Sequence, residues 1–265
     1  MRLGIIIILV IIINMLDTLA YGARIAGVKT KSPTMAASLF NLLALVSRIA
    51  NLIQLPLLAV LVDRAIAANA QDALLPVFRV VILANSVGTL LGIFLIPTFV
   101  NVIMQGIYAL EKFGSVPSAF VGGLKGGVFR KAMHSFRLPA KRHLHLLNIN
   151  GLPKYFLVAN LLLTAIYSVG ILAAIYAGCL VPEYRLTASN LSGIINGLAT
   201  IFLVIFVDPV TALLQDQIIQ GKREETDLKR AVSLLLGGRF LGSLLAQFLF
   251  LPAAHVVVLI TYFIS

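Results

Sequence analysis

Six long segments of this chain are almost entirely apolar, and the few polar residues inside them recur at spacings typical of one helix face. An apolar segment of about 20 residues is long enough to cross a bilayer as a helix. The clearest polar stripes are Asn14, Asp17, Tyr21 and Arg24 in the first segment, and Asn41, Ala44, Ser47, Arg48, Asn51 and Gln54 in the second. The pattern predicts membrane helices that carry polar stripes.

The predicted spans are residues 3–22, 34–62, 77–110, 155–180, 191–219 and 232–264. Their continuous apolar runs exclude a transmembrane barrel, whose strands would show short alternating segments. We therefore predict an all-α polytopic membrane protein, a single transmembrane domain over residues 1–265 with six helices in three hairpins. Four spans contain a proline at which a kink or break would help to line a cavity, namely Pro56, Pro97, Pro209 and Pro252.

The first span also has the outline of a signal peptide, because Met1 and Arg2 precede an apolar run through Ile13. Asn14 and Asp17 interrupt that outline, and no clean small-residue cleavage site follows. We expect this segment to remain as a span.

Charge predicts the orientation of the spans. Hydrophobic residues make up 60% of the chain, the mean hydropathy is +1.00 and the net charge is +11. Fifteen Lys and Arg residues lie in the loops 23–33, 111–154 and 220–231, whereas the other side holds only Arg2, Arg64 and Arg185. Positively charged loops stay in the cytoplasm. Both termini are therefore predicted to be extracytoplasmic.

The basic residues also indicate a class of partner. In a soluble protein this charge would suggest nucleic acid, but here it lies beside membrane spans, which favours anionic phospholipids and no nucleic acid. Between spans three and four, basic residues alternate with aromatic ones, which predicts a basic amphipathic segment lying in the membrane interface. The glycine-rich run 122–127 inside it fails the Walker spacing and is predicted to be a flexible loop.

Metal, redox and enzyme chemistry have little support. Cys179 is the single cysteine, and His143 and His145 have no carboxylate or cysteine beside them, so we predict no disulfide, metal site or cofactor. The chain contains neither HExxH nor GxSxG and shows no nucleophile flanked by a base. We predict no catalytic residues, although an intramembrane phosphatase using arginine and a carboxylate stays open as an alternative.

Arg48 is the most informative single residue, since it falls about 21 Å from the start of its helix, near the bilayer centre. A guanidinium there costs at least about 2.5–3.5 kcal/mol and nearly always faces a bundle interior or a water-filled cavity. One interpretation is a structural ion pair with Asp17. The other is a binding cavity.

A repeat supports the cavity. Asp208 and Arg239 are 31 residues apart, as are Asp17 and Arg48, which predicts two hairpins related by a pseudo-two-fold axis along the membrane normal. Arginine suits bidentate recognition of phosphate or carboxylate. The predicted substrate-binding residues are Asp17, Tyr21, Arg24, Arg48, Asn51, Asp208, Asp216 and Arg239, with further hydrogen bonds from Asn41, Gln215, Ser243 and Gln247.

Several long motifs in these segments resemble the Amj family of bacterial lipid II flippases, alternates to MurJ. They are LDTLAYGARIAG (16–27), SLFN (38–41), SRIAN (47–51), YRLT (184–187), SGIINGLAT (192–200) and VDP (207–209). The resemblance covers nearly the whole chain. It implies transport of the undecaprenyl-pyrophosphate-linked peptidoglycan precursor from the inner to the outer leaflet of the bacterial cytoplasmic membrane.

The resemblance and the polar residues together predict a lipid II flippase working by alternating access, with intramembrane arginines binding the pyrophosphate. Two alternatives stay open. One is an enzyme or accessory protein of undecaprenyl phosphate recycling, and the other is a non-catalytic membrane partner of wall-synthesis enzymes. Six spans are few for a carrier of so large a lipid, which favours a homodimer.

Overall fold

The computed structural model describes residues 2–115, 118 and 152–264. The basic amphipathic segment predicted between spans three and four, with its glycine-rich run and histidines, lies almost wholly outside the described residues. The helices are α1 (Arg2–Ala20), α2 (Gly22–Lys29), α3 (Pro33–Ala67), α4 (Leu74–Phe113), α7 (Lys154–Leu180), α8 (Arg185–Phe206), α9 (Asp208–Ile219) and α10 (Glu225–Ile264), with short 3-10 turns Gln71–Ala73 and Pro182–Tyr184.

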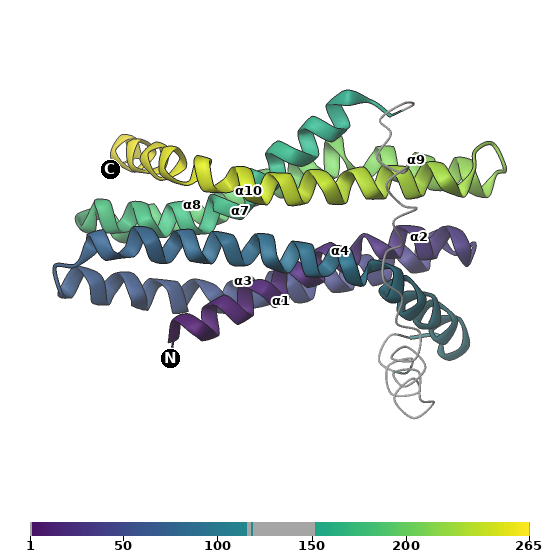
Figure 1. The fold of residues 1–265 in the computed structure, drawn as a ribbon, viewed down its shortest axis with the longest axis horizontal. Coiled ribbons are helices and arrows are strands. Elements are labelled where there is room, and N and C mark those ends of the chain that lie inside the picture. The colour runs from purple at the N-terminus through teal and green to yellow at the C-terminus, as the bar shows by residue number, and fades with distance from the viewer. Residues whose placement is uncertain (1, 116–117, 119–151, 265) are drawn as a thin grey trace.

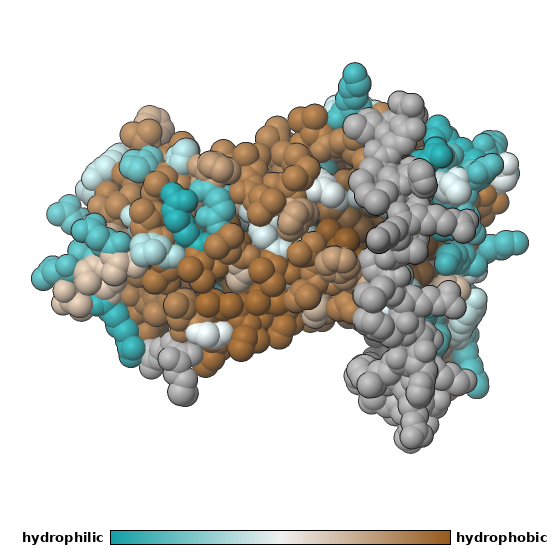
Figure 2. Space-filling view, viewed as in Figure 1, coloured by the Kyte–Doolittle hydropathy of each residue, from teal (hydrophilic) through white to brown (hydrophobic). Residues whose placement is uncertain are grey.

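The prediction of an all-α polytopic membrane protein is confirmed. The described residues form six helical segments long and apolar enough to cross a membrane, and they contain no strand. The helices run roughly parallel to the long axis, with the α3–α4 and α7–α8 turns at one end and the α2–α3 and α9–α10 turns at the other (Figure 1). A broad apolar band lies between two polar ends (Figure 2).

Two of the six segments are interrupted helices. The first continues beyond the predicted span: after a turn at Tyr21 the chain re-forms a helix, so residues 23–29, predicted to be loop, belong to α2. The fifth is interrupted at Val207, just before Pro209, whose ring removes a backbone donor. The helices with Pro56, Pro97 and Pro252 continue through them. Only Pro209 therefore accompanies a break.

In the described residues the core consists of two large apolar clusters, with polar residues between them, and a smaller third cluster where α7, α8 and α10 meet. One surrounds Phe78, Tyr176 and Phe250, whose ring centroids are 5.3–5.8 Å apart. The other surrounds Ile107 and Phe156 at the opposite end of the helices. Along each long helix the intervening stretch carries the polar residues, which we call the central polar layer: Asn14, Asp17, Thr18, Ser47, Arg48, Asn51, Asn85, Ser86, Thr89, Asn160, Thr164, Tyr167, Ser168, Arg239 and Ser243.

Glycines on α4 let α1 approach this layer closely. A Cβ on Gly92 would lie 2.6 Å from Thr18 Cβ, and one on Gly88 would collide with the Ile11 carbonyl oxygen. Small residues four apart are typical of close helix packing in membranes.

We expect Gly92→Ala to lower the melting temperature of the purified protein, because the added methyl group overpacks the α1–α4 contact at a cost of about 1–3 kcal/mol. Gly193→Ala is the matched control, since no atom lies within 4 Å of its Cβ position. Thermal unfolding in detergent, followed by size-exclusion chromatography, measures both. Equal melting temperatures for the two variants would contradict this packing.

Candidate functional site

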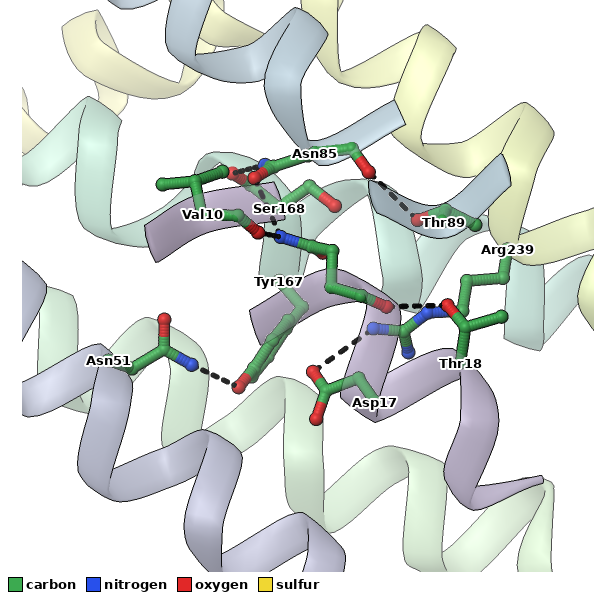
Figure 3. A network of polar contacts seen from close by, with 10 residues as sticks. Val10, Asp17, Thr18, Asn51, Asn85, Thr89, Tyr167, Ser168 and Arg239 are labelled. Carbon is green, nitrogen blue, oxygen red and sulfur yellow. Dashed lines mark hydrogen bonds and ion pairs between the residues drawn. The ribbon is translucent and has the colours of Figure 1, made fainter. Parts of the chain in front are cut away.

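An ion pair joins the first and last helices inside the central polar layer. Arg239 on α10 donates to Asp17 on α1 at 3.1 Å, with 8% and 14% of the two side chains exposed (Figure 3). The pair links residues 222 positions apart. Two opposite charges at this separation stabilise each other strongly where the dielectric constant is low. The Arg239 Nε has no hydrogen-bond partner among the described residues, so this guanidinium retains an unused donor.

A second ion pair joins the two interrupted helices. Arg24 on α2 donates to Asp208, the first residue of α9. A carboxylate at a helix N-terminus is stabilised by the helix dipole. The Arg24 guanidinium lies 5.5 Å from the ring centroid of Tyr21 and 5.2 Å from that of Phe40, within range for cation–π attraction. The Gln215 amide donates to the Arg24 carbonyl oxygen at 2.9 Å. Arg24 is therefore held from several sides.

Arg48 differs from the other two arginines. It is exposed on α3, and within the described part of the chain it has neither an ion pair nor a hydrogen bond. The structural Asp17–Arg48 pair considered from the sequence is not formed, because Asp17 is taken by Arg239. The central polar layer thus contains one cation without a partner.

Arg48, Asp17, Asp208 and Arg239 line one cavity of about 100 Å³, which we call the central cavity. Its polar lining is Asp17, Tyr21, Arg48, Thr164, Tyr167, Thr200, Asp208 and Arg239. Helix α3 contributes one wall and α8 another, but these two helices are not among the pairs that pack closely in the described residues. Thr164 on α7 also lines the cavity, and its buried hydroxyl has no hydrogen-bond partner among the described residues.

Two further cavities adjoin the central one. A cavity of about 170 Å³, the α9 cavity, shares Phe40 and Asp208 with it and is also lined by Arg24, Asn41 and Gln215. A cavity of about 20 Å³, the amide cavity, shares Tyr167 with it. Its polar lining is Asn14, Asn51, Gln54, Asn85, Tyr167, Ser168 and Asn196. The three cavities therefore form a series, in which the central cavity shares residues with each of the other two.

Neutral hydrogen bonds hold the helices around the amide cavity (Figure 3). Asn14 donates to the Asn85 side chain at 2.8 Å, and Asn85 donates to the Ser168 carbonyl oxygen at 3.3 Å. These contacts join α1, α4 and α7. Asn51 on α3 donates to the Tyr167 hydroxyl at 3.2 Å, at the boundary with the central cavity.

Most of the substrate-binding residues predicted from the sequence lie around this series of cavities. Asp17, Tyr21, Arg48, Asp208 and Arg239 line the central cavity, Arg24 the α9 cavity and Asn51 the amide cavity. Asp216 is exposed on α9 and lines none of the three.

Of the four residues predicted to supply further hydrogen bonds, two line a cavity and two do not. Asn41 and Gln215 line the α9 cavity. Ser243 instead donates to the Ser86 hydroxyl at 2.9 Å, and Gln247 donates to the Arg79 carbonyl oxygen at 2.9 Å. These last two residues join α10 to α4 outside the cavities.

Sequence reasoning missed the contribution of spans three and four. Thr164 and Tyr167 on α7 line the central cavity, and Asn85 on α4 lines the amide cavity. An available signal was that each of these polar residues interrupts an apolar run at mid-span.

Comparison of the sequence with known proteins shows the family of the chain. Residues 9–261 match the family described as Amj, alternate to MurJ. The chain belongs to the Amj family. It is 38% identical over 252 residues to the protein named lipid II flippase Amj from Bacillus subtilis (strain 168), a match that covers 95% of this chain and 93% of that protein. No solved structure matches the chain.

Membership of the Amj family and the six apolar helices make this a multi-pass protein of the cytoplasmic membrane. The relative's name describes a transporter rather than an enzyme. In the described residues no group of three His, Cys, Asp or Glu side chains is arranged to hold a metal ion. What the site offers chemically is a set of arginines, two carboxylates and neutral hydrogen-bonding groups in an apolar surrounding.

Proposed function

We propose that this protein is a lipid II flippase and that the central cavity binds the pyrophosphate of the substrate during its passage from the inner to the outer leaflet. The family match supports the substrate. The single observation that supports the binding site is Arg48, a mid-span guanidinium that lines the cavity with no partner among the described residues. An unpaired cation at this depth is costly unless an anion or water reaches it.

The charges around the cavity suit an anionic ligand. Arg24 and Arg239 are neutralised by Asp208 and Asp17, so Arg48 leaves one positive charge in excess. A pyrophosphate arriving at Arg48 supplies the missing negative charge. It also finds two unused buried donors, the Arg239 Nε and the Thr164 hydroxyl. Hydrogen bonds between charged groups are the strong ones, particularly to arginine.

Helices α3 and α8 do not pack closely in the described residues, so the lipid can enter the central cavity between them. Both helices line the central cavity, and both present large apolar side chains outward, such as Leu52 and Ile201. The undecaprenyl tail stays in the bilayer while the pyrophosphate enters between the two helices. Only the polar head of the substrate then needs polar partners.

The interrupted helices support alternating access. The break at Tyr21 separates α1 from α2, and the break at Val207 separates α8 from α9, each beside the central cavity. Interrupted helices at membrane depth are a feature of transporters in which one bundle moves against another. In this mechanism the Arg24–Asp208 and Asp17–Arg239 pairs hold those arginines in the empty protein.

The charge of the loops supports an orientation in the membrane, and the small number of spans supports a dimer. With both termini extracytoplasmic, the α9–α10 turn with Lys222 and Arg223 faces the cytoplasmic leaflet, where anionic phospholipids attract basic residues. We also propose that two copies assemble in the membrane, because six spans enclose little space for so large a lipid.

The function is tested in cells that carry only this protein as a flippase. After depletion of the other flippase, lipid II is expected to reach the outer leaflet and growth to continue, whereas an empty vector stops both. Labelling of outer-leaflet lipid II measures the transport. If the protein releases phosphate from undecaprenyl pyrophosphate and exposes no lipid II, it is a recycling enzyme and the proposal is wrong.

A further inference from the structure

The amide cavity has a composition that packing alone does not explain. Seven of its lining residues are polar, and within the described residues none of the lining side chains is charged. Polar side chains at this depth normally pair with each other, since lipid offers them no hydrogen bonds. Asn14 and Asn85 follow this rule because they connect neighbouring helices.

Two of the amide side chains in the lining do not follow it. Gln54 on α3 is 6% exposed and has no hydrogen-bond partner among the described residues. The Asn196 Oδ1 on α8 is buried and equally unpartnered there. Neither side chain holds two helices together by a hydrogen bond. Their unused amide groups, on two different walls of one cavity, indicate a ligand that both donates and accepts hydrogen bonds.

The chemistry of the lining restricts the class of that ligand. An anion would lack a cation in this lining, and a metal ion would lack a carboxylate. Neutral amides beside a tyrosine hydroxyl suit a neutral, hydroxyl- and amide-rich group instead. In lipid II such a group, the saccharide, is attached directly to the pyrophosphate. In the structure the amide cavity adjoins the central cavity and shares Tyr167 with it.

We infer that the amide cavity is the subsite for the saccharide of the substrate while the central cavity binds its pyrophosphate. This inference rests on the proposed function. At about 20 Å³ the cavity has room for one water molecule, so the structure shows the subsite closed. The Asn51–Tyr167 hydrogen bond lies at its boundary with the central cavity and joins α3 to α7. Separation of α3 from α7 at this bond opens the subsite.

The test compares two ligands that differ in the saccharide. Purified protein in lipid nanodiscs is titrated with lipid II and with undecaprenyl pyrophosphate, which lacks the saccharide. Gln54→Leu is expected to weaken lipid II binding about tenfold, the size of one lost hydrogen bond, and to leave undecaprenyl pyrophosphate binding unchanged. Because Gln54 has no hydrogen bond to lose within the described residues, the variant should fold normally. Asn196→Ala is expected to show the same selective loss.

Gln105→Leu is the matched control, since the same substitution is made in a membrane helix, α4, outside all three cavities. It should leave both affinities unchanged. If Gln54→Leu and Asn196→Ala leave lipid II binding at the wild-type value, or weaken both ligands equally, the saccharide subsite is wrong and the flippase proposal stands. If the wild-type protein binds neither ligand, the proposed function fails first and the subsite falls with it.

Discussion

Arg48→Ala is expected to slow lipid II transport strongly while leaving the protein folded. Arg48 is exposed and forms no hydrogen bond or ion pair within the described residues, so its removal breaks neither kind of contact there. The substitution instead removes a charged hydrogen-bond donor that would bind the pyrophosphate. The lost hydrogen bond corresponds to about a ten- to hundredfold decrease in transport rate at low substrate concentration. Movement of lipid II across reconstituted vesicles measures this rate.

Two variants show whether the effect belongs to the guanidinium. Arg48→Lys retains the charge but not the bidentate geometry and should recover only part of the activity. Arg64→Ala is the matched control, because Arg64 is also exposed on α3 but lines none of the three cavities. Full transport by Arg48→Ala at wild-type expression would remove Arg48 from the mechanism.

Breaking the Asp17–Arg239 pair is expected to have the largest effect on stability. Either Asp17→Asn or Arg239→Gln leaves one buried charge without its partner, which costs about 3–5 kcal/mol. The double variant leaves two neutral amides in place of the charges. Its melting temperature should therefore exceed that of at least one single variant, although it carries more changes. Melting in detergent under identical conditions measures all three.

The surface pair Lys229–Glu225 is the control for this experiment. It lies one helical turn apart with both side chains exposed, so Lys229→Gln should change the melting temperature very little. Effects of Asp17→Asn and Arg239→Gln that simply add in the double variant would show that the two charges do not stabilise each other, contrary to their distance of 3.1 Å.

The ion pairs of the arginines show which features the sequence alone could predict. Spacing placed Arg48 near the bilayer centre and predicted a cavity shared by Asp17, Arg48 and Arg239, and all three line one cavity in the structure. Spacing also offered Asp17 and Arg48 as partners 31 residues apart. The structure pairs Asp17 with Arg239 instead, 222 residues away, because the rotation and neighbours of each helix decide which side chain is within reach.

The interruption of the helices shows a similar limit. Pro209 predicted a break in the fifth span, and α8 does end just before it. Tyr21 carries no such signal, and the sequence ended the first span there rather than continuing it as α2. A local sequence pattern indicates where a helix ends. The position of the helix that follows depends on tertiary contacts, here the ion pair of Arg24 with Asp208 and the packing of Tyr21 against Phe40.

By itself, the sequence determined the six apolar helices and the presence of charged residues within them. Lipid offers no hydrogen bonds, so the backbone of a spanning segment must form its hydrogen bonds within the protein. The length and hydropathy of these segments are therefore sufficient to predict helices. Only the tertiary structure decided which arginines are paired, which arginine of the central cavity has no partner among the described residues, and that the polar residues of α4 and α7 complete the cavities. Those features depend on side chains brought together from distant parts of the chain, where spacing along one helix carries no information.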